Sequence, residues 1–248
     1  MSLLHERVAL TREESSLWRR LAWATLAPRR SFDAVQGREA AHDWLFPALL
    51  ATAVGLVAHF ATVGLVTDLN APGAQRAMAA MDPARREQFV QGIEALRAHG
   101  WMMVPTGVFS SLVVVAAALL VVTRWLGGSQ VSFRQMLVVK AYASLTLIPE
   151  WAVRTPAMLL TGDANVRTGP ALFLAPEQAG GLLGRVVAGM NVFDIWQLWI
   201  QVVGVAVLGG TSLRKAGVVL TALWLAWIVG GAALEGYGVA ALPSPAAG

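Results

Sequence analysis

The chain has 248 residues, of which 56% are hydrophobic and only 14% are charged, and its net charge is +4. A soluble globular domain carries about 25% charged residues, so this chain has too few polar groups to cover a folded surface in water. Its mean hydropathy of +0.57 agrees with that exclusion and predicts a protein whose solvent is largely lipid. The absence of cysteine excludes disulfides, thiolate metal ligands and a cysteine nucleophile.

Residues 1–43 form a polar, mixed-charge segment that we expect to be cytoplasmic or interfacial. Within it, residues 15–26 have helical periodicity and are followed by Pro28, which predicts an amphipathic helix in the plane of the membrane interface. The aromatic residues of this region would enter lipid and its arginines would face lipid phosphates. These predicted interface residues are Trp18, Arg19, Arg20, Trp23, Arg29 and Arg30. The alternative is a soluble helix that packs on the cytoplasmic loops of the bundle.

Five apolar segments follow, each long enough to cross a hydrocarbon core of about 30 Å at about 1.5 Å per residue. They cover approximately residues 44–66, 101–126, 135–160, 190–208 and 216–234. The expected fold is therefore an all-α, polytopic membrane protein, with a five-helix membrane domain over 44–235 and a short tail over 236–248.

Polar and helix-breaking residues interrupt the third apolar segment, which we therefore expect to be kinked or broken. They are Lys140, Pro149, Glu150, Arg154 and Pro156. Lys140 lies near one end of the segment, and its long stem is expected to carry the ammonium out to the cytoplasmic interface.

The polar stretch between the first two spans contains a separate helix signal. Asp82 and Pro83 suit the N-cap and first helical positions, and Gly100 suits the helix end.

Basic residues are distributed unevenly among the connections. They gather before the first span, around residues 124–134 and at 214–215, whereas arginines in the opposite loops are balanced by acids. Because positive residues in short loops stay in the cytoplasm, this pattern predicts an internal N-terminus, an external C-terminus and an odd number of spans.

Several polar residues fall in the outer parts of the predicted spans and form a candidate cluster. They are His59, Glu150, Arg154, Asp194, Gln197 and Gln201. Ionisable groups at membrane depth are functional candidates by default. Glu150 and Arg154 have the spacing of a local ion pair, and Arg154 has Asp194 as an alternative partner.

Two interpretations of this cluster remain open. In one, the polar groups hydrogen-bond to each other and hold the helices together. In the other, Glu150, Asp194 and His59 line a hydrated cavity that binds or relays a cation or a proton.

Catalytic and metal motifs are missing from the sequence. There is no GxxxxGK[ST] loop, no HExxH motif and no GxSxG elbow with a plausible histidine partner. The four histidines are scattered without metal-ligand spacing. We therefore expect no enzyme activity, no cofactor and no metal site. The basic residues flank apolar segments, so we also expect no nucleic-acid partner.

Three segments resemble the prokaryotic branch of the Yip family, membrane proteins named for relatives that interact with Ypt/Rab GTPases. The segments are LAPRRSFDAV at 26–35, WLGGSQVSFRQMLVVKAYASLTLIP at 125–149, and NVFDIWQLWIQVVGV at 191–205. The second segment contains the motif residues Gly127, Gly128, Phe133, Tyr142 and Pro149. The resemblance covers about residues 26–235, but the acidic Asp-Leu-Tyr-Gly-Pro motif of the eukaryotic relatives is absent. It implies a five-helix fold and a role in membrane organisation or trafficking.

These observations together favour a non-enzymatic scaffold, membrane organiser or accessory subunit of a membrane complex. A small transporter or channel subunit is the alternative. The expected partners are membrane lipids and either another protein or further copies of the chain. The preference for arginine over lysine, with abundant alanine, suggests a multi-pass protein of a bacterial inner membrane.

Overall fold

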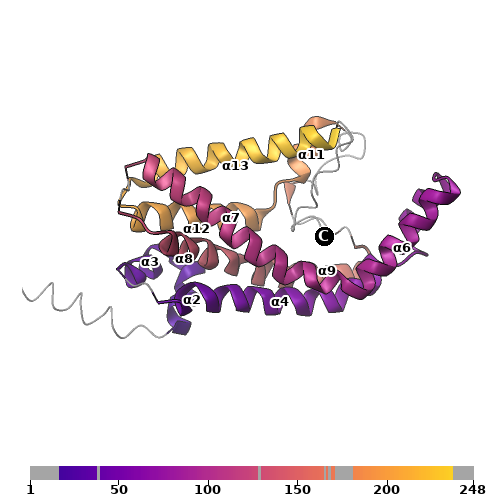
Figure 1. Cartoon of the computed structure of the whole chain (residues 1–248), viewed down its shortest axis with the longest axis horizontal. Coiled ribbons are helices and arrows are strands. Elements are labelled where there is room, and N and C mark those ends of the chain that lie inside the picture. Colours follow the sequence, from indigo (N-terminus) through magenta and orange to yellow (C-terminus); the bar gives the residue numbers. More distant parts are fainter. Residues whose placement is uncertain are drawn as a thin grey trace, which may run out of the picture.

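The computed structural model describes residues 17–37, 40–127, 130–164, 166, 169–170 and 181–236, and this described part is built of helices without strands (Figure 1). Short 3-10 turns, η1 and η2, connect some of the helices. The elements in chain order are α2 (Leu17–Leu26), α3 (Pro28–Val35), α4 (His42–Val66), α5 (Pro72–Ala79), α6 (Pro83–His99), η1 (Gly100–Met102), α7 (Met103–Trp125), α8 (Phe133–Ala143), η2 (Ser144–Thr146), α9 (Leu147–Thr161), α11 (Leu182–Ala188), α12 (Val192–Leu208) and α13 (Leu213–Gly236).

Four helical runs in the described part are long and apolar enough to cross a membrane, and a fifth crossing is available from a bent pair. The four runs are α4, α6 to α7 through η1, α8 to α9 through η2, and α13. Helices α11 and α12 meet at 67° and pass the same test only together. At 17 residues, α12 alone is about 25 Å long and falls short of a hydrocarbon core. The prediction of an all-α polytopic membrane protein is confirmed.

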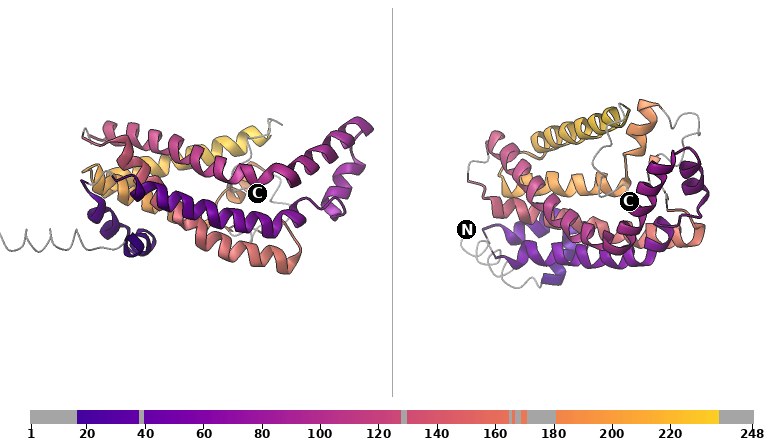
Figure 2. Two further views of the ribbon diagram at one scale, coloured as in Figure 1. Left: turned by 60° about the horizontal axis from the view of Figure 1, so that its bottom comes forward. Right: turned by 45° about the vertical axis from the view of Figure 1, so that its right-hand side comes forward.

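Helix α6 forms where the sequence predicted a helix in the polar stretch, and its start is capped as expected. The Asp82 carboxylate accepts a hydrogen bond from the backbone N–H of Arg85 at 2.9 Å, and Pro83 occupies the first turn. The helix projects beyond the rest of the bundle and joins α7 through η1 (Figure 2). The shorter helix α5, which precedes it, was not predicted.

The third apolar segment is broken, as predicted, at the 3-10 turn η2. The break lies just before Pro149, which sits in the first turn of α9, where its missing N–H costs no helical hydrogen bond. Pro156 lies inside α9.

The N-terminal region forms a pair of helices packed on the bundle, where the sequence predicted a single helix. Pro28 ends the first helix and opens the second, α3, which the sequence analysis missed. Helix α3 packs against α12, and α2 packs against α3, α8 and η2. The indole N–H of Trp196 on α12 donates to the carbonyl of Thr25 at 3.1 Å, which fixes the end of α2. These contacts are made with helices of the bundle, and an interfacial position of the pair stays a prediction.

Arg20 does not face lipid phosphates, and that prediction is wrong. Its side chain is buried, and Nη2 lies 3.2 Å from Oδ1 of Asp43, which is also buried at the start of α4. A buried carboxylate attracts the nearest guanidinium because both charges would otherwise be stranded away from water. Arg19, Arg29 and Arg30 are exposed, and that they face lipid phosphates stays a prediction.

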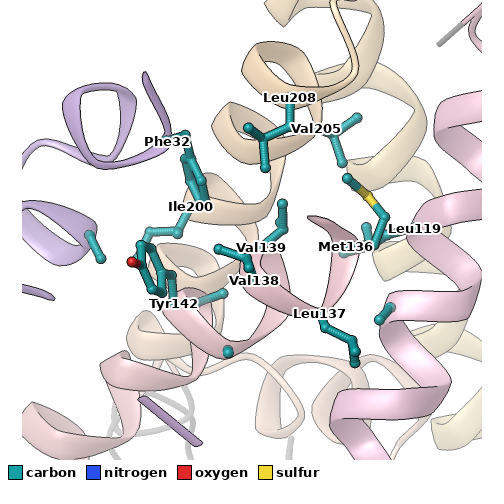
Figure 3. Close-up of a cluster of buried hydrophobic side chains, with 14 of the residues drawn as sticks. Phe32, Leu119, Met136, Leu137, Val138, Val139, Tyr142, Ile200, Val205 and Leu208 are labelled. Atoms are coloured by element: carbon teal, nitrogen blue, oxygen red, sulfur yellow. The ribbon is translucent and has the colours of Figure 1, made fainter. Parts of the chain in front are cut away.

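The aromatic residues of the N-terminal region divide between surface and core. Trp18 is exposed but contacts the ring of Phe46 edge-on, with centroids 5.3 Å apart, and Trp23 is half-buried. On α3, Phe32 is fully buried and stacks on Tyr142 of α8 at 5.8 Å. Figure 3 shows this pair beside Ile200, in the hydrophobic core that α3, α8 and α12 share.

A glycine permits the close approach of α12 to α3 and α8. A Cβ added at Gly204 would lie 2.7 Å from Cγ1 of Val139 and 2.9 Å from Cζ of Phe32. Both neighbours are fully buried and have little room to move, so a side chain at position 204 would separate the helices.

Replacing Arg20 with Gln should destabilise the protein by about 3 kcal/mol, because the buried Asp43 carboxylate loses its close cationic partner. Thermal unfolding in detergent would measure this as a lower Tm. The matched control is Arg19→Gln on the exposed neighbouring residue, with an expected change below about 1 kcal/mol. Adding Asp43→Asn to Arg20→Gln should recover part of the loss. Equal Tm values for the two single variants would contradict the buried pair.

Candidate functional site

Lys140 lies inside the bundle rather than at the interface, so the prediction that its stem extends to the cytoplasmic surface is wrong. The residue is only 6% exposed, and its ammonium donates a hydrogen bond of 2.6 Å to Oε1 of Gln197 on α12. The Gln197 amide in turn donates to the hydroxyl of Thr146 at 3.4 Å. A polar acceptor on the facing helix therefore replaces the water that the ammonium would have found at the interface.

A second polar contact joins the next helix, α9, to the start of α12. The Asn191 amide donates to Oε1 of Glu150 at 2.7 Å, and Glu150 is almost fully buried. The side-chain oxygen Oδ1 of Asn191 accepts a hydrogen bond from the backbone N–H of Phe193 and so caps α12. One side chain thus satisfies a helix end and a buried carboxylate together.

We call the contact of α12 with the α8–η2–α9 run the central seam. Its polar members are Lys140, Thr146, Glu150, Asn191 and Gln197, and its close-packed member is Gly204. Asp194 is half-buried on α12 and interacts electrostatically with Lys140 and Glu150. Lys140 on α8 and Asp194 on α12 therefore carry opposite charges along one contact. Polar groups inside a membrane bundle need such protein partners.

Neither ion pair predicted for Arg154 forms among the described residues. Glu150 accepts a hydrogen bond from Asn191 instead, and the ion pairs found in the described part do not include Arg154 with Asp194. The buried guanidinium of Arg154 lies over the ring of Trp151, with its central carbon 5.6 Å from the ring centroid. Arg154 also interacts electrostatically with Glu150.

The structure separates His59 and Gln201 from the seam's hydrogen bonds. His59 is half-buried on α4, edge-on to Phe60 and beside Gly100. Gln201 is half-buried on α12, and no hydrogen bond among the described residues joins it to the seam. In the part of the chain that the structure describes, no three His, Asp or Glu side chains are placed to hold a metal ion.

Sequence reasoning missed Thr146 and the role of Asn191. Asn191 precedes the first apolar residue of its helix, which is an N-cap signal that was available in the sequence. Thr146 gives no such signal, because its hydroxyl becomes a partner only when the 3-10 turn η2 packs on α12.

The family-motif residues start and fill helix α8. Gly127 has φ of +100°, a conformation that residues with a side chain rarely adopt, and it ends the turn after α7. Phe133 is the first residue of α8, whose start is closed by a capping box of Ser132 and Gln135. Tyr142 is fully buried and Pro149 lies in the first turn of α9. Gly128 lies outside the described residues.

Replacing Gln197 with Leu should cost about 1–3 kcal/mol, because the buried Lys140 ammonium loses its acceptor. Adding Lys140→Met should reduce the cost below that of Gln197→Leu alone, since both partners are then apolar. Gln201→Leu, one turn away on the same helix, is the matched control with a small expected effect. Unfolding in detergent would be measured for the wild type, Gln197→Leu, Lys140→Met, the double variant and Gln201→Leu. Strictly additive effects of Gln197→Leu and Lys140→Met would show that the contact carries no energy.

The three segments that carry the Yip resemblance meet in space. Phe32 from the first segment stacks on Tyr142 from the second, and both lie beside α12, which comes from the third.

Among known protein families, the model of the Yip1 domain matches residues 23–234, nearly the whole of the helical bundle. No curated protein and no solved structure matches the chain. The chain belongs to the Yip1 domain family.

Proposed function

We propose that this multi-pass membrane protein is a non-enzymatic scaffold, membrane organiser or accessory subunit of a membrane complex. The observation that carries the proposal is the central seam. Its polar side chains bond to one another across helices, at 2.6 Å for Lys140 with Gln197 and 2.7 Å for Asn191 with Glu150. Groups used in this way stabilise a fixed helix arrangement, and interhelical hydrogen bonds are a common means of doing so in membranes.

The surface proposed for partners is the exposed face of the helix pair α2–α3. Trp18 and Leu26 are 65% and 80% exposed, and Arg29 and Arg30 are exposed at the start of α3. Aromatic, aliphatic and cationic side chains side by side suit either anionic lipid or an acidic, apolar surface of another protein. We place this face in the cytoplasm of a bacterial inner-membrane protein, with the C-terminus outside, because basic residues gather at this end of the bundle.

Membership of the Yip1 domain family supports this proposal, since it is not a known enzyme family. The rival function is transport of an ion or a proton. Its support is the burial of two ionisable side chains, Lys140 and Glu150, within one membrane-spanning run.

Crosslinking the tagged full-length protein in its native membrane, followed by mass spectrometry, tests the proposal. We expect a stoichiometric protein partner that is lost in the Arg29→Gln/Arg30→Gln variant, because the proposed face loses both cations. The control Arg85→Gln/Arg86→Gln, on the distant helix α6, should retain that partner. Loss from both variants, or from neither, would contradict the assignment to this face.

Proteoliposomes distinguish the rival function. The scaffold proposal predicts no ion or proton flux above that of empty liposomes. A flux that Glu150→Gln abolishes while Tm is unchanged would establish transport instead.

A further inference from the structure

A cavity of about 470 Å³ lies where the end of α7 meets the start of α13. Trp125 and Leu126 line it from one side, and Arg214, Lys215, Val218 and Val219 line it from the other. In Figure 1 the two helices meet at this end of the bundle, the end that also holds α3, and diverge away from it. The cavity therefore has a basic rim at the bundle's end and apolar walls along the helices.

The two cations at the rim are free to bind a ligand. Arg214 and Lys215 are exposed, and no ion pair or side-chain hydrogen bond joins either of them to another described residue. Three other arginines of the bundle are engaged: Arg20 pairs with Asp43, Arg97 donates to Thr67, and Arg124 donates to the Val131 carbonyl. The sequence has no acidic residue from 103 to 137 or from 195 to 234, so local carboxylates do not neutralise the rim.

The apolar side of the cavity faces the hydrocarbon phase. Val218 is 65% exposed and Trp125 is 76% exposed, although both belong to membrane-spanning runs. An indole at a helix end favours the depth of the lipid headgroups. A ligand that suits the site must combine a negative charge at the rim with an aliphatic chain along α13.

We propose that this cavity binds one anionic phospholipid. The phosphate lies against Arg214 and Lys215, and one acyl chain runs along Val218 and Val219 beside the Trp125 ring. The free N–H groups at the start of α13, where Ser212 caps the backbone of Lys215 at 3.2 Å, add positive potential at the same place. Basic pockets between helices are a recognised way of holding anionic headgroups.

Native mass spectrometry of the full-length protein in neutral detergent tests the site with phosphatidylglycerol and phosphatidylcholine as probes. We expect the wild type to retain one phosphatidylglycerol more tightly than phosphatidylcholine. The Arg214→Gln/Lys215→Gln variant should bind phosphatidylglycerol about thirtyfold more weakly, since each of the two cations near a lipid surface contributes about 1 kcal/mol. The matched control Arg85→Gln/Arg86→Gln removes two neighbouring cations from α6 and should bind as the wild type does.

Three outcomes would overturn the proposal. Equal retention of the two lipids by the wild type would do so whether or not the variants fold. Unchanged phosphatidylglycerol binding by Arg214→Gln/Lys215→Gln, at an unchanged Tm, would place the lipid elsewhere. In the third, soluble glycerol phosphate displaces bound phosphatidylglycerol at the same concentration at which added phosphatidylglycerol does. That result would show a site for phosphate alone, to which the apolar wall contributes nothing.

Discussion

Within the hydrocarbon core of a membrane, every polar group must find its partner in the protein, and the central seam is where this chain meets that requirement. Lys140 and Glu150 are nearly inaccessible, and α12 supplies an acceptor to one and a donor to the other. The break at η2 is part of the same solution, because it places the Thr146 hydroxyl within reach of Gln197. The polar side chains thus fix which face α12 presents to its neighbour.

Close packing and the N-terminal helices extend the seam into a complete core. Gly204 allows α12 to approach Val139, and Phe32 from α3 fills the space beside Tyr142. Helix α2 is then held by the buried pair of Arg20 and Asp43, which ties it to α4. Removal of the N-terminal pair would therefore expose part of the membrane domain's core, so residues 17–37 belong to the folded unit.

The sequence allowed prediction of the features whose signals are local. Apolar length located α4, α7 and α13, and Asp82 with Pro83 located the start of α6. It could not predict contacts that depend on distant parts of the chain. Lys140 and Gln197 are 57 residues apart, and a lysine near the end of a span gives no sign of whether it turns outward or inward. Arg20 was misplaced for the same reason, since its partner lies on a later helix. The N-in, C-out orientation stays a prediction.

The most direct test of the central seam is a disulfide between Val139→Cys and Gly204→Cys, formed by mild oxidation in native membranes. The chain has no other cysteine, so any intramolecular bond reports this pair. A Cβ at position 204 would lie 2.7 Å from Cγ1 of Val139, within the reach of a disulfide. Val139→Cys replaces the two γ-carbons that such a Cβ would meet with the single sulfur that bonds to residue 204, so the pair relieves the contact that a side chain at 204 makes with native Val139. We expect mass spectrometry to find the linked peptides in high yield, and little linkage for the control pair Val139→Cys with Gly230→Cys on α13. A yield no higher than that of the control would contradict the packing of α8 on α12.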